Sequence, residues 1–117
     1  MSGQRFEDLE VWKKAYTLSV GIFRAFKSCK DYGFKDQITR ASLSIASNIA
    51  EGYERSTNNE FIHFLYIAKG SCGELRTQLY VAIEIGYLEK QKADEFIESA
   101  KQISYMLNAL IQKRKTF

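Results

Sequence analysis

Proline is absent from all 117 residues of this chain, although average usage of roughly 5% would place about six prolines in it. Proline breaks helix interiors and is common in loops and at sheet edges, so its absence favours long, uninterrupted helices. The alternation of apolar and polar residues that is typical of half-buried strands is also missing. We therefore predict an all-α protein.

Clusters of Gly, Asn, Ser and Asp divide the chain into four stretches that each carry the 3.6-residue apolar period of an amphipathic helix. We expect helices over about 8–28, 34–51, 58–85 and from 89 or 90 to the end of the chain. Asp8 is a predicted N-cap, and Thr57 with Glu60 is a predicted capping box. Gly52 and Gly86 suit the residue after a helix, where glycine most easily adopts a left-handed backbone.

The four helices are joined by short connections, which predicts an antiparallel up-down-up-down four-helix bundle. The length fits a single domain over residues 1–117. In the third stretch the apolar residues keep the 4-3-4-3 spacing of a bundle seam: Phe61, Leu65, Ala68, Cys72, Leu75, Leu79 and Ala82. These residues are the predicted core of that helix.

The first helix carries more apolar surface than one core needs. Two neighbouring stripes, one of which includes Trp12, Tyr16 and Phe23, together cover roughly 200° of its circumference. A helix at the surface of a single core needs an arc a little over ~100° wide. The surplus predicts a second buried contact, with another copy of the chain.

Several segments are similar to the four-helix-bundle proteins encoded by intervening sequences of bacterial 23S rRNA genes, a family that includes accessory variability proteins of diversity-generating retroelements. The segments that carry the resemblance are Phe6–Trp12, Ser44–Gly52, Glu60–Phe61, Phe64–Ala68, Gly70–Ser71, Glu74–Leu75 and Gly86–Leu88. The chain departs from the family pattern at Ala46, where proline is frequent, and at Cys72, Gly73 and Arg76.

The resemblance implies a homo-oligomer, a pentameric ring of bundles, that associates with RNA or DNA. It also implies an alternative role as a scaffold that docks a partner protein, such as the reverse transcriptase of a retroelement. Catalysis is not part of either role.

The net charge of +3 permits binding to a polyanion without requiring it. In an up-down bundle the last helix ends near the start of the first, so we expect one end to gather the candidate nucleic-acid-binding residues Arg5, Lys13, Arg55, Lys113, Arg114 and Lys115. The alternative is that cations in a last helical turn only complement the helix dipole. Exposed tyrosines could also stack on RNA bases; the candidates are Tyr53, Tyr66, Tyr80, Tyr87 and Tyr105.

The second helix places Gln37, Ser44, Asn48 and Glu51 within about 60° of one another, beside its apolar stripe. Asn48 and Glu51 could form a binding site. The favoured interpretation is structural, because groups at a helix end need hydrogen-bond partners. Together with Gly52 and Trp12, these two residues are our candidate structural and interface residues, and we expect Glu51 to pair with Arg55 or Arg76.

No arrangement of residues predicts an enzyme, a metal site or a cofactor. His63 is the only histidine and has no carboxylate four residues before or after it. Cys29 and Cys72 are too few and too far apart for a zinc site, and no phosphate-binding glycine motif occurs. The chain shows neither a signal peptide nor a membrane-length apolar run, so we expect a cytoplasmic protein with no membrane partner.

Overall fold

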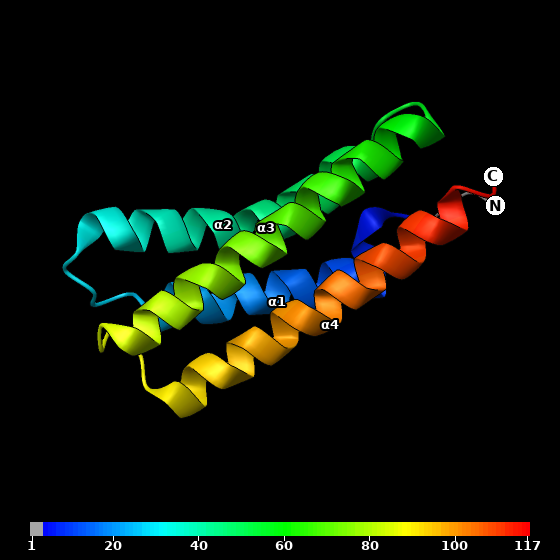
Figure 1. The fold of residues 1–117 in the computed structure, drawn as a ribbon. Coiled ribbons are helices and arrows are strands. Elements are labelled where there is room, and N and C mark those ends of the chain that lie inside the picture. Colours follow the sequence, from blue (N-terminus) through cyan, green and yellow to red (C-terminus); the bar gives the residue numbers. More distant parts are fainter. Residues whose placement is uncertain (1–3) are drawn as a thin grey trace.

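A computed structural model describes residues 4–117 and contains a four-helix bundle (Figure 1). Residues 1–3, which the predicted domain includes, lie outside the described part. The elements are the short 3-10 helix η1 (Phe6–Asp8) and the helices α1 (Glu10–Ala25), α2 (Tyr32–Tyr53), α3 (Asn58–Glu84) and α4 (Lys90–Arg114). Residues 4–117 form no strand. The predicted all-α fold is confirmed.

Each helix packs against the helix before and the helix after it in the chain, and α1 closes the bundle against α4. The molecule measures 47 × 20 × 20 Å along its principal axes. The α2–α3 connection lies at the same end as both termini, and the α1–α2 and α3–α4 connections lie at the opposite end (Figure 1). The up-down-up-down order is therefore as predicted.

The start of the first helix differs from the prediction. The Asp8 carboxylate accepts a hydrogen bond from the backbone N–H of Arg5 at 3.1 Å, so Asp8 closes η1. Leu9 occupies the N-cap position of α1, and Asp8 is not that cap. The helix also ends at Ala25, three residues before the predicted end. α2 then begins two residues early because the Asp31 carboxylate accepts the Phe34 N–H at 3.2 Å.

Gly52 does not follow α2, as predicted, but lies inside it, and α2 continues to Tyr53. The residue is buried, and a Cβ atom added there would lie 2.6 Å from Cβ of Phe64 and 3.1 Å from Cδ1 of Phe61. Glycine is therefore required because α2 and α3 approach closely. Gly86 has a φ of 80° and follows α3, as predicted.

The predicted cap of α3 is present with a different second bond. The Thr57 hydroxyl accepts the backbone N–H of Glu60 at 3.1 Å. The Glu60 carboxylate accepts the Thr57 hydroxyl at 3.2 Å rather than the Thr57 backbone N–H. The start of the helix is still fixed at Asn58, which agrees with the predicted boundary.

The predicted seam of α3 lies in the core. Its seven residues are all buried, and Leu65, Leu75 and Leu79 are completely inaccessible. Burial of a leucine side chain contributes roughly 1.5–3 kcal/mol. A polar pair also lies between α1 and α2, where the buried hydroxyls of Ser19 and Ser42 are 3.3 Å apart. Ser42 donates its own proton to the carbonyl of Thr39, so these hydroxyls are paired.

A hydrogen bond between Tyr87 and Asp31 joins the α3–α4 connection to the α1–α2 connection. The Tyr87 hydroxyl donates to the Asp31 carboxylate at 2.6 Å, and the Tyr87 ring packs edge-on against Phe34. The bond from Tyr87, and then that from the Phe34 N–H, lower the pKa of Asp31 below its ordinary value. The same bond raises the pKa of Tyr87.

None of the helices among residues 4–117 is both long and apolar enough to cross a membrane.

Candidate nucleic-acid interface

The end of the bundle near the termini is held by Asn58 and Arg114. The Asn58 amide donates to the Arg114 carbonyl at 2.9 Å, and Arg114 Nε donates to the Asn58 side-chain oxygen at 3.1 Å. The Arg114 guanidinium lies over the rings of Phe61 and Phe117, at 4.7 and 4.4 Å from their centroids. Arg114 therefore joins the start of α3 to the end of α4, and it forms no ion pair within residues 4–117.

Arg55 lies between two carboxylates. Its guanidinium is 2.9 Å from Glu51 and 3.3 Å from Glu60, and it lies over the Phe64 ring. Of the two partners expected for Glu51, the structure thus selects Arg55 rather than Arg76. The charge of Arg55 is balanced within the protein, so this residue adds little attraction for a polyanion.

The remaining predicted cations do not form one continuous surface. Lys13 pairs with Glu10 at 3.2 Å and lines a groove of about 460 Å³ between α1 and α4, together with Lys14 and Lys92. Arg5 is exposed beside η1. Lys113 and Lys115 are exposed and form no ion pair within residues 4–117; Lys115 lies 5.5 Å from the centre of the Tyr66 ring. The end near the termini thus brings Lys113, Arg114 and Lys115 together with the neutralised Arg55.

The charges of α4 are strongly segregated along the helix. Its acidic residues are Asp94, Glu95 and Glu98, all in the first half. After Glu98 the chain contains no acidic side chain, and its charged residues are Lys101, Lys113, Arg114 and Lys115. We call these four residues the α4 cation strip. The second part of the helix therefore carries positive charge at Lys101 and again at its C-terminal end, with no acidic residue between them.

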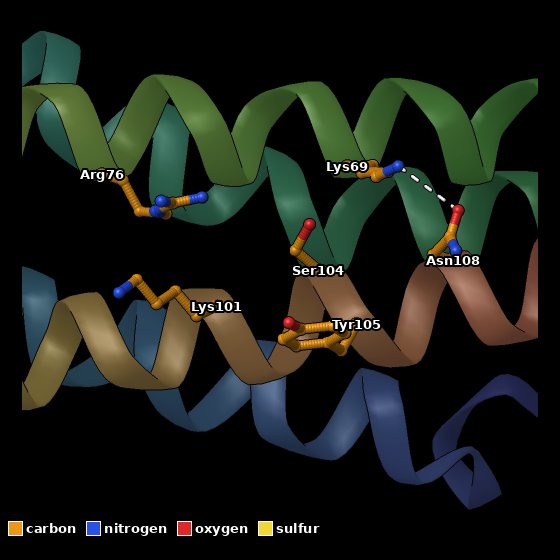
Figure 2. Close-up of a pocket in the computed structure, with 6 residues that line it drawn as sticks. All are labelled: Lys69, Arg76, Lys101, Ser104, Tyr105 and Asn108. Atoms are coloured by element: carbon orange, nitrogen blue, oxygen red, sulfur yellow. Dashed lines mark hydrogen bonds between the residues drawn. The ribbon is translucent and has the colours of Figure 1, made fainter.

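A groove of about 350 Å³ between α3 and α4 extends the positive surface toward the middle of the bundle (Figure 2). We call it the α3–α4 groove; it is lined by Lys69 and Arg76 of α3 and by Lys101, Ser104, Tyr105 and Asn108 of α4. No acidic residue belongs to this lining. Lys69 donates to the Asn108 side-chain oxygen at 3.3 Å across the groove. The Nε atom of Arg76 is buried and has no hydrogen-bond partner within residues 4–117.

The groove was not predicted from the sequence, although a signal was available. Lys69 and Arg76 are seven residues apart, and Tyr105 and Asn108 follow Lys101 by four and seven residues. These spacings place each set on one helix face. What the spacing could not supply is that the two faces lie opposite each other.

Asn48 supports a hydrogen bond between two helices through Ser44. Its amide donates to the carbonyl and the hydroxyl of Ser44 at 2.8 and 2.9 Å. The Ser44 hydroxyl is in turn 2.9 Å from that of Ser71 on α3, which bonds the Ile67 carbonyl. Gln37 and Glu51, the other members of the predicted cluster, are exposed. Asn48 is thus hydrogen-bonded within the protomer, in an arrangement suited to holding α2 against α3.

The surplus apolar surface of α1 remains exposed in the protomer. Tyr16 and Phe23 are 54% and 44% exposed, and Leu43 of α2 beside them is 49% exposed. With Val20 and Ala46 they line a hollow of about 340 Å³, which we call the apolar patch. Trp12, one of the predicted interface residues, is half-buried and stacks on Tyr16 with ring centres 5.3 Å apart.

The histidine and the two cysteines do not line the α3–α4 groove. His63 is exposed and packs edge-on against Phe64. Burial raises the pKa of the Cys72 thiol to about 12, an effect that the charge of Arg76 partly offsets. Cys29 is half-buried beside the α1–α2 connection. Within residues 4–117 no group of three or more His, Cys, Asp or Glu side chains could hold a metal ion.

The five candidate tyrosines differ in accessibility. Tyr53 packs against Phe61, and Tyr87 is bound to Asp31. Tyr66 and Tyr80 are about half exposed, at 44% and 51%. Tyr105 is 79% exposed, the most of the five, and lies at the α3–α4 groove. It therefore offers the most accessible ring for stacking.

Comparison with known proteins places the fold in a known group. A crystal structure of a protein of unknown function from the S23 ribosomal protein family of Bacteroides thetaiotaomicron VPI-5482 superposes with a TM-score of 0.81 at 24% sequence identity. The alignment covers 86% of this chain and 97% of that chain. No curated protein matches the chain. The family profile described as 23S rRNA-intervening sequence protein matches residues 7–109. The chain therefore belongs to the 23S rRNA-intervening sequence protein family.

Proposed function

We propose that the protein is a non-enzymatic oligomer that associates with RNA or other nucleic acid through the phosphate backbone. The observation that carries this proposal is the charge distribution of α4. After Glu98 the chain has four cations and no acidic residue, and none of the four forms an ion pair within residues 4–117. A polyanion would therefore meet cations at Lys101 and at the end of α4, with no acidic residue of α4 between them.

Backbone recognition requires accessible cations and no special geometry for base edges. Lys113 and Lys115 are exposed, and Arg114 presents a guanidinium that other residues hold in place without neutralising it. The α3–α4 groove adds Lys69 and Arg76 to the same side of the bundle. The description of the family, which refers to sequences within 23S rRNA genes, favours RNA as the first nucleic acid to test.

Self-association is the second part of the proposal. The apolar patch exposes large side chains of α1 and α2 side by side, and contiguous exposed apolar surface is a frequent mark of a protein–protein contact. We propose that a second copy covers it, and that a ring of copies repeats the α4 cation strip. The resemblance noted above makes a pentamer the expected assembly. The alternative occupant is a partner protein such as a reverse transcriptase, for which this chain would be a scaffold.

The proposal includes no catalytic step. The Cys72 thiol is buried and its pKa of about 12 keeps it protonated near neutral pH, so it cannot act as a thiolate nucleophile. His63, the only histidine, contacts an aromatic ring rather than a second polar group that would orient it as a base. The exposed cations Lys113 and Lys115 are instead suited to binding the negative charge of phosphate groups.

Size-exclusion chromatography with mass measurement tests both parts together. We expect the protein to elute as an oligomer and to retain added RNA at about 50 mM salt but not at about 200 mM. The variant Lys113→Glu/Lys115→Glu should elute as the same oligomer without RNA, because it reverses two charges but leaves the Arg114 contacts in place.

Two results would contradict the proposal. Retention of RNA that ignores both salt and the charge-reversing variant would exclude backbone electrostatics through these residues. A mass equal to one 13.5 kDa chain at micromolar concentration would exclude self-association. An oligomer that forms only with an added partner protein would favour the scaffold alternative.

A further inference from the structure

We infer that the α3–α4 groove binds single-stranded nucleic acid, with one phosphate held by Arg76 and Lys101 and the neighbouring base stacked on Tyr105. This inference rests on the proposed function and gives it a site and a strand preference. Lys101 belongs both to the α4 cation strip and to the lining of the groove.

The charged residues that line the groove are all cationic, which favours binding of an anion. Two cationic side chains from α3 and one from α4 line it, and the lining contains no carboxylate (Figure 2). None of these three cations forms an ion pair within residues 4–117, although six ion pairs occur elsewhere in that part of the chain. The positive charge of the groove is thus uncompensated within the protomer.

Arg76 gives the strongest indication of a missing ligand. Its Nε is buried and has no hydrogen-bond partner among the described residues. A buried polar group without a partner is unfavourable, and each such group calls for an explanation. A phosphate oxygen would supply the acceptor, since a guanidinium can bind phosphate through two parallel N–H bonds.

The space beside Arg76 is also open. Gly73 lies on the same face of α3 as Lys69 and Arg76 at 100° per residue. A Cβ atom added at Gly73 would have no atom within 4 Å, apart from the neighbouring backbone. The close approach of helices that explains glycine at position 52 therefore does not explain it here. Gly73 is exposed and lies outside the groove lining, so it leaves this side of α3 open to solvent.

The groove suits one nucleotide rather than a duplex. Its volume of about 350 Å³ lies near the lower end of the roughly 300–1,000 Å³ that small-ligand pockets occupy. Tyr105 is 79% exposed at its edge. A base can stack on a tyrosine only where it is not already stacked in a helix, which favours single strands. Ser104 and the Asn108 amide group can donate further hydrogen bonds to the same nucleotide.

Fluorescence anisotropy with a labelled single-stranded RNA, and with the same RNA annealed to its complement, tests the inference. The full chain should bind the single strand more tightly than the duplex. Tyr105→Ala should weaken single-strand binding about tenfold and duplex binding little, since stacking of one base is worth roughly a factor of ten or more. Arg76→Gln should weaken it similarly and lower the salt slope by about 0.7.

Matched variants separate the groove from the rest of the surface. Tyr32→Ala and Arg40→Gln change an exposed tyrosine and an exposed arginine outside the groove, and both should bind like the wild type. Thermal unfolding of each variant, followed by circular dichroism, confirms that the compared proteins are folded. A polyglutamate peptide of equal charge serves as competitor and should displace the RNA only weakly.

The inference fails on its own if Arg76→Gln and Tyr105→Ala bind RNA like the wild type while Lys113→Glu/Lys115→Glu does not. That result would leave the proposed function standing. Equal affinity for single strand and duplex, or efficient displacement by polyglutamate, would also overturn it. If the wild type binds no nucleic acid at low salt, the proposed function and the groove both fail.

Discussion

Replacement of Gly52 by alanine is the sharpest test of how the bundle is packed. The added Cβ would lie 2.6 Å from Cβ of Phe64, an atom fixed directly to the backbone of α3. Ordinary contact begins at 3.4 Å, so the two helices would have to separate by about 0.8 Å. A rotation of the Phe64 side chain cannot relieve this contact, because rotation about χ1 does not move Cβ.

The magnitude follows from two opposing effects. Overpacking of a core costs typically 1–3 kcal/mol, and a contact against backbone-fixed atoms belongs near the upper end, about 3 kcal/mol. Alanine is better than glycine inside a helix by about 1 kcal/mol. We therefore expect the free energy of unfolding to fall by about 2 kcal/mol. For a domain of this size that corresponds to a melting temperature lower by about 8 °C.

Urea unfolding followed by circular dichroism measures this difference, and Gly70→Ala is the matched control. Gly70 also lies inside a helix, but an added Cβ would have no atom within 4 Å there. The control should leave stability unchanged or raise it by up to about 1 kcal/mol. If Gly52→Ala were as stable as Gly70→Ala, that result would contradict the close packing of α2 against α3 at Gly52.

Three further predictions concern the other contacts. Asn48→Ala removes two hydrogen bonds to Ser44 and should lower the free energy of unfolding by about 1 kcal/mol in urea titrations; unchanged stability would argue against a structural role. Tyr16→Glu/Leu43→Glu places charge on the apolar patch, and light scattering should then show a smaller assembly than the wild type; an unchanged mass would place the contact elsewhere. Hydrogen bonds from Tyr87 and from the Phe34 N–H lower the pKa of Asp31. At pH values above the ordinary carboxyl pKa these bonds stabilise the fold. The stabilisation is lost as pH falls through the lowered pKa. Tyr87→Phe should flatten the acid side of the stability–pH curve, and an identical curve would contradict this assignment.

Helix periodicity predicted the fold well because each core position in a bundle repeats along a single helix. The buried seam of α3 and the glycine after it could be read directly from spacing and residue type. The positions of the caps were less predictable. Asp8 closes η1 and Asp31 caps α2. Both are acidic residues just before an apolar-periodic stretch, so only the actual path of the chain distinguishes their roles.

The arrangement of the candidate site was predictable only where its residues are close together in the chain. Lys113, Arg114 and Lys115 were found because they are consecutive, and the Glu51–Arg55 pair because four residues separate its members. Lys13 lines the groove between α1 and α4 with Lys14 and Lys92, an arrangement that helix spacing alone does not give. Arg76 and Lys101 come from different helices, and only the packing of α3 on α4 brings them to one groove.

The salt dependence of RNA affinity tests the central claim most directly. Affinities of wild type and of Lys113→Gln/Lys115→Gln for one single-stranded RNA would be measured by anisotropy between about 50 and about 200 mM salt. Each phosphate contact contributes about 0.7 to the slope of log affinity against log salt for single strands. We expect a steep slope for the wild type and a slope lower by up to about 1.4 for the variant. Equal slopes, or no binding by the wild type at the lowest salt, would contradict the account.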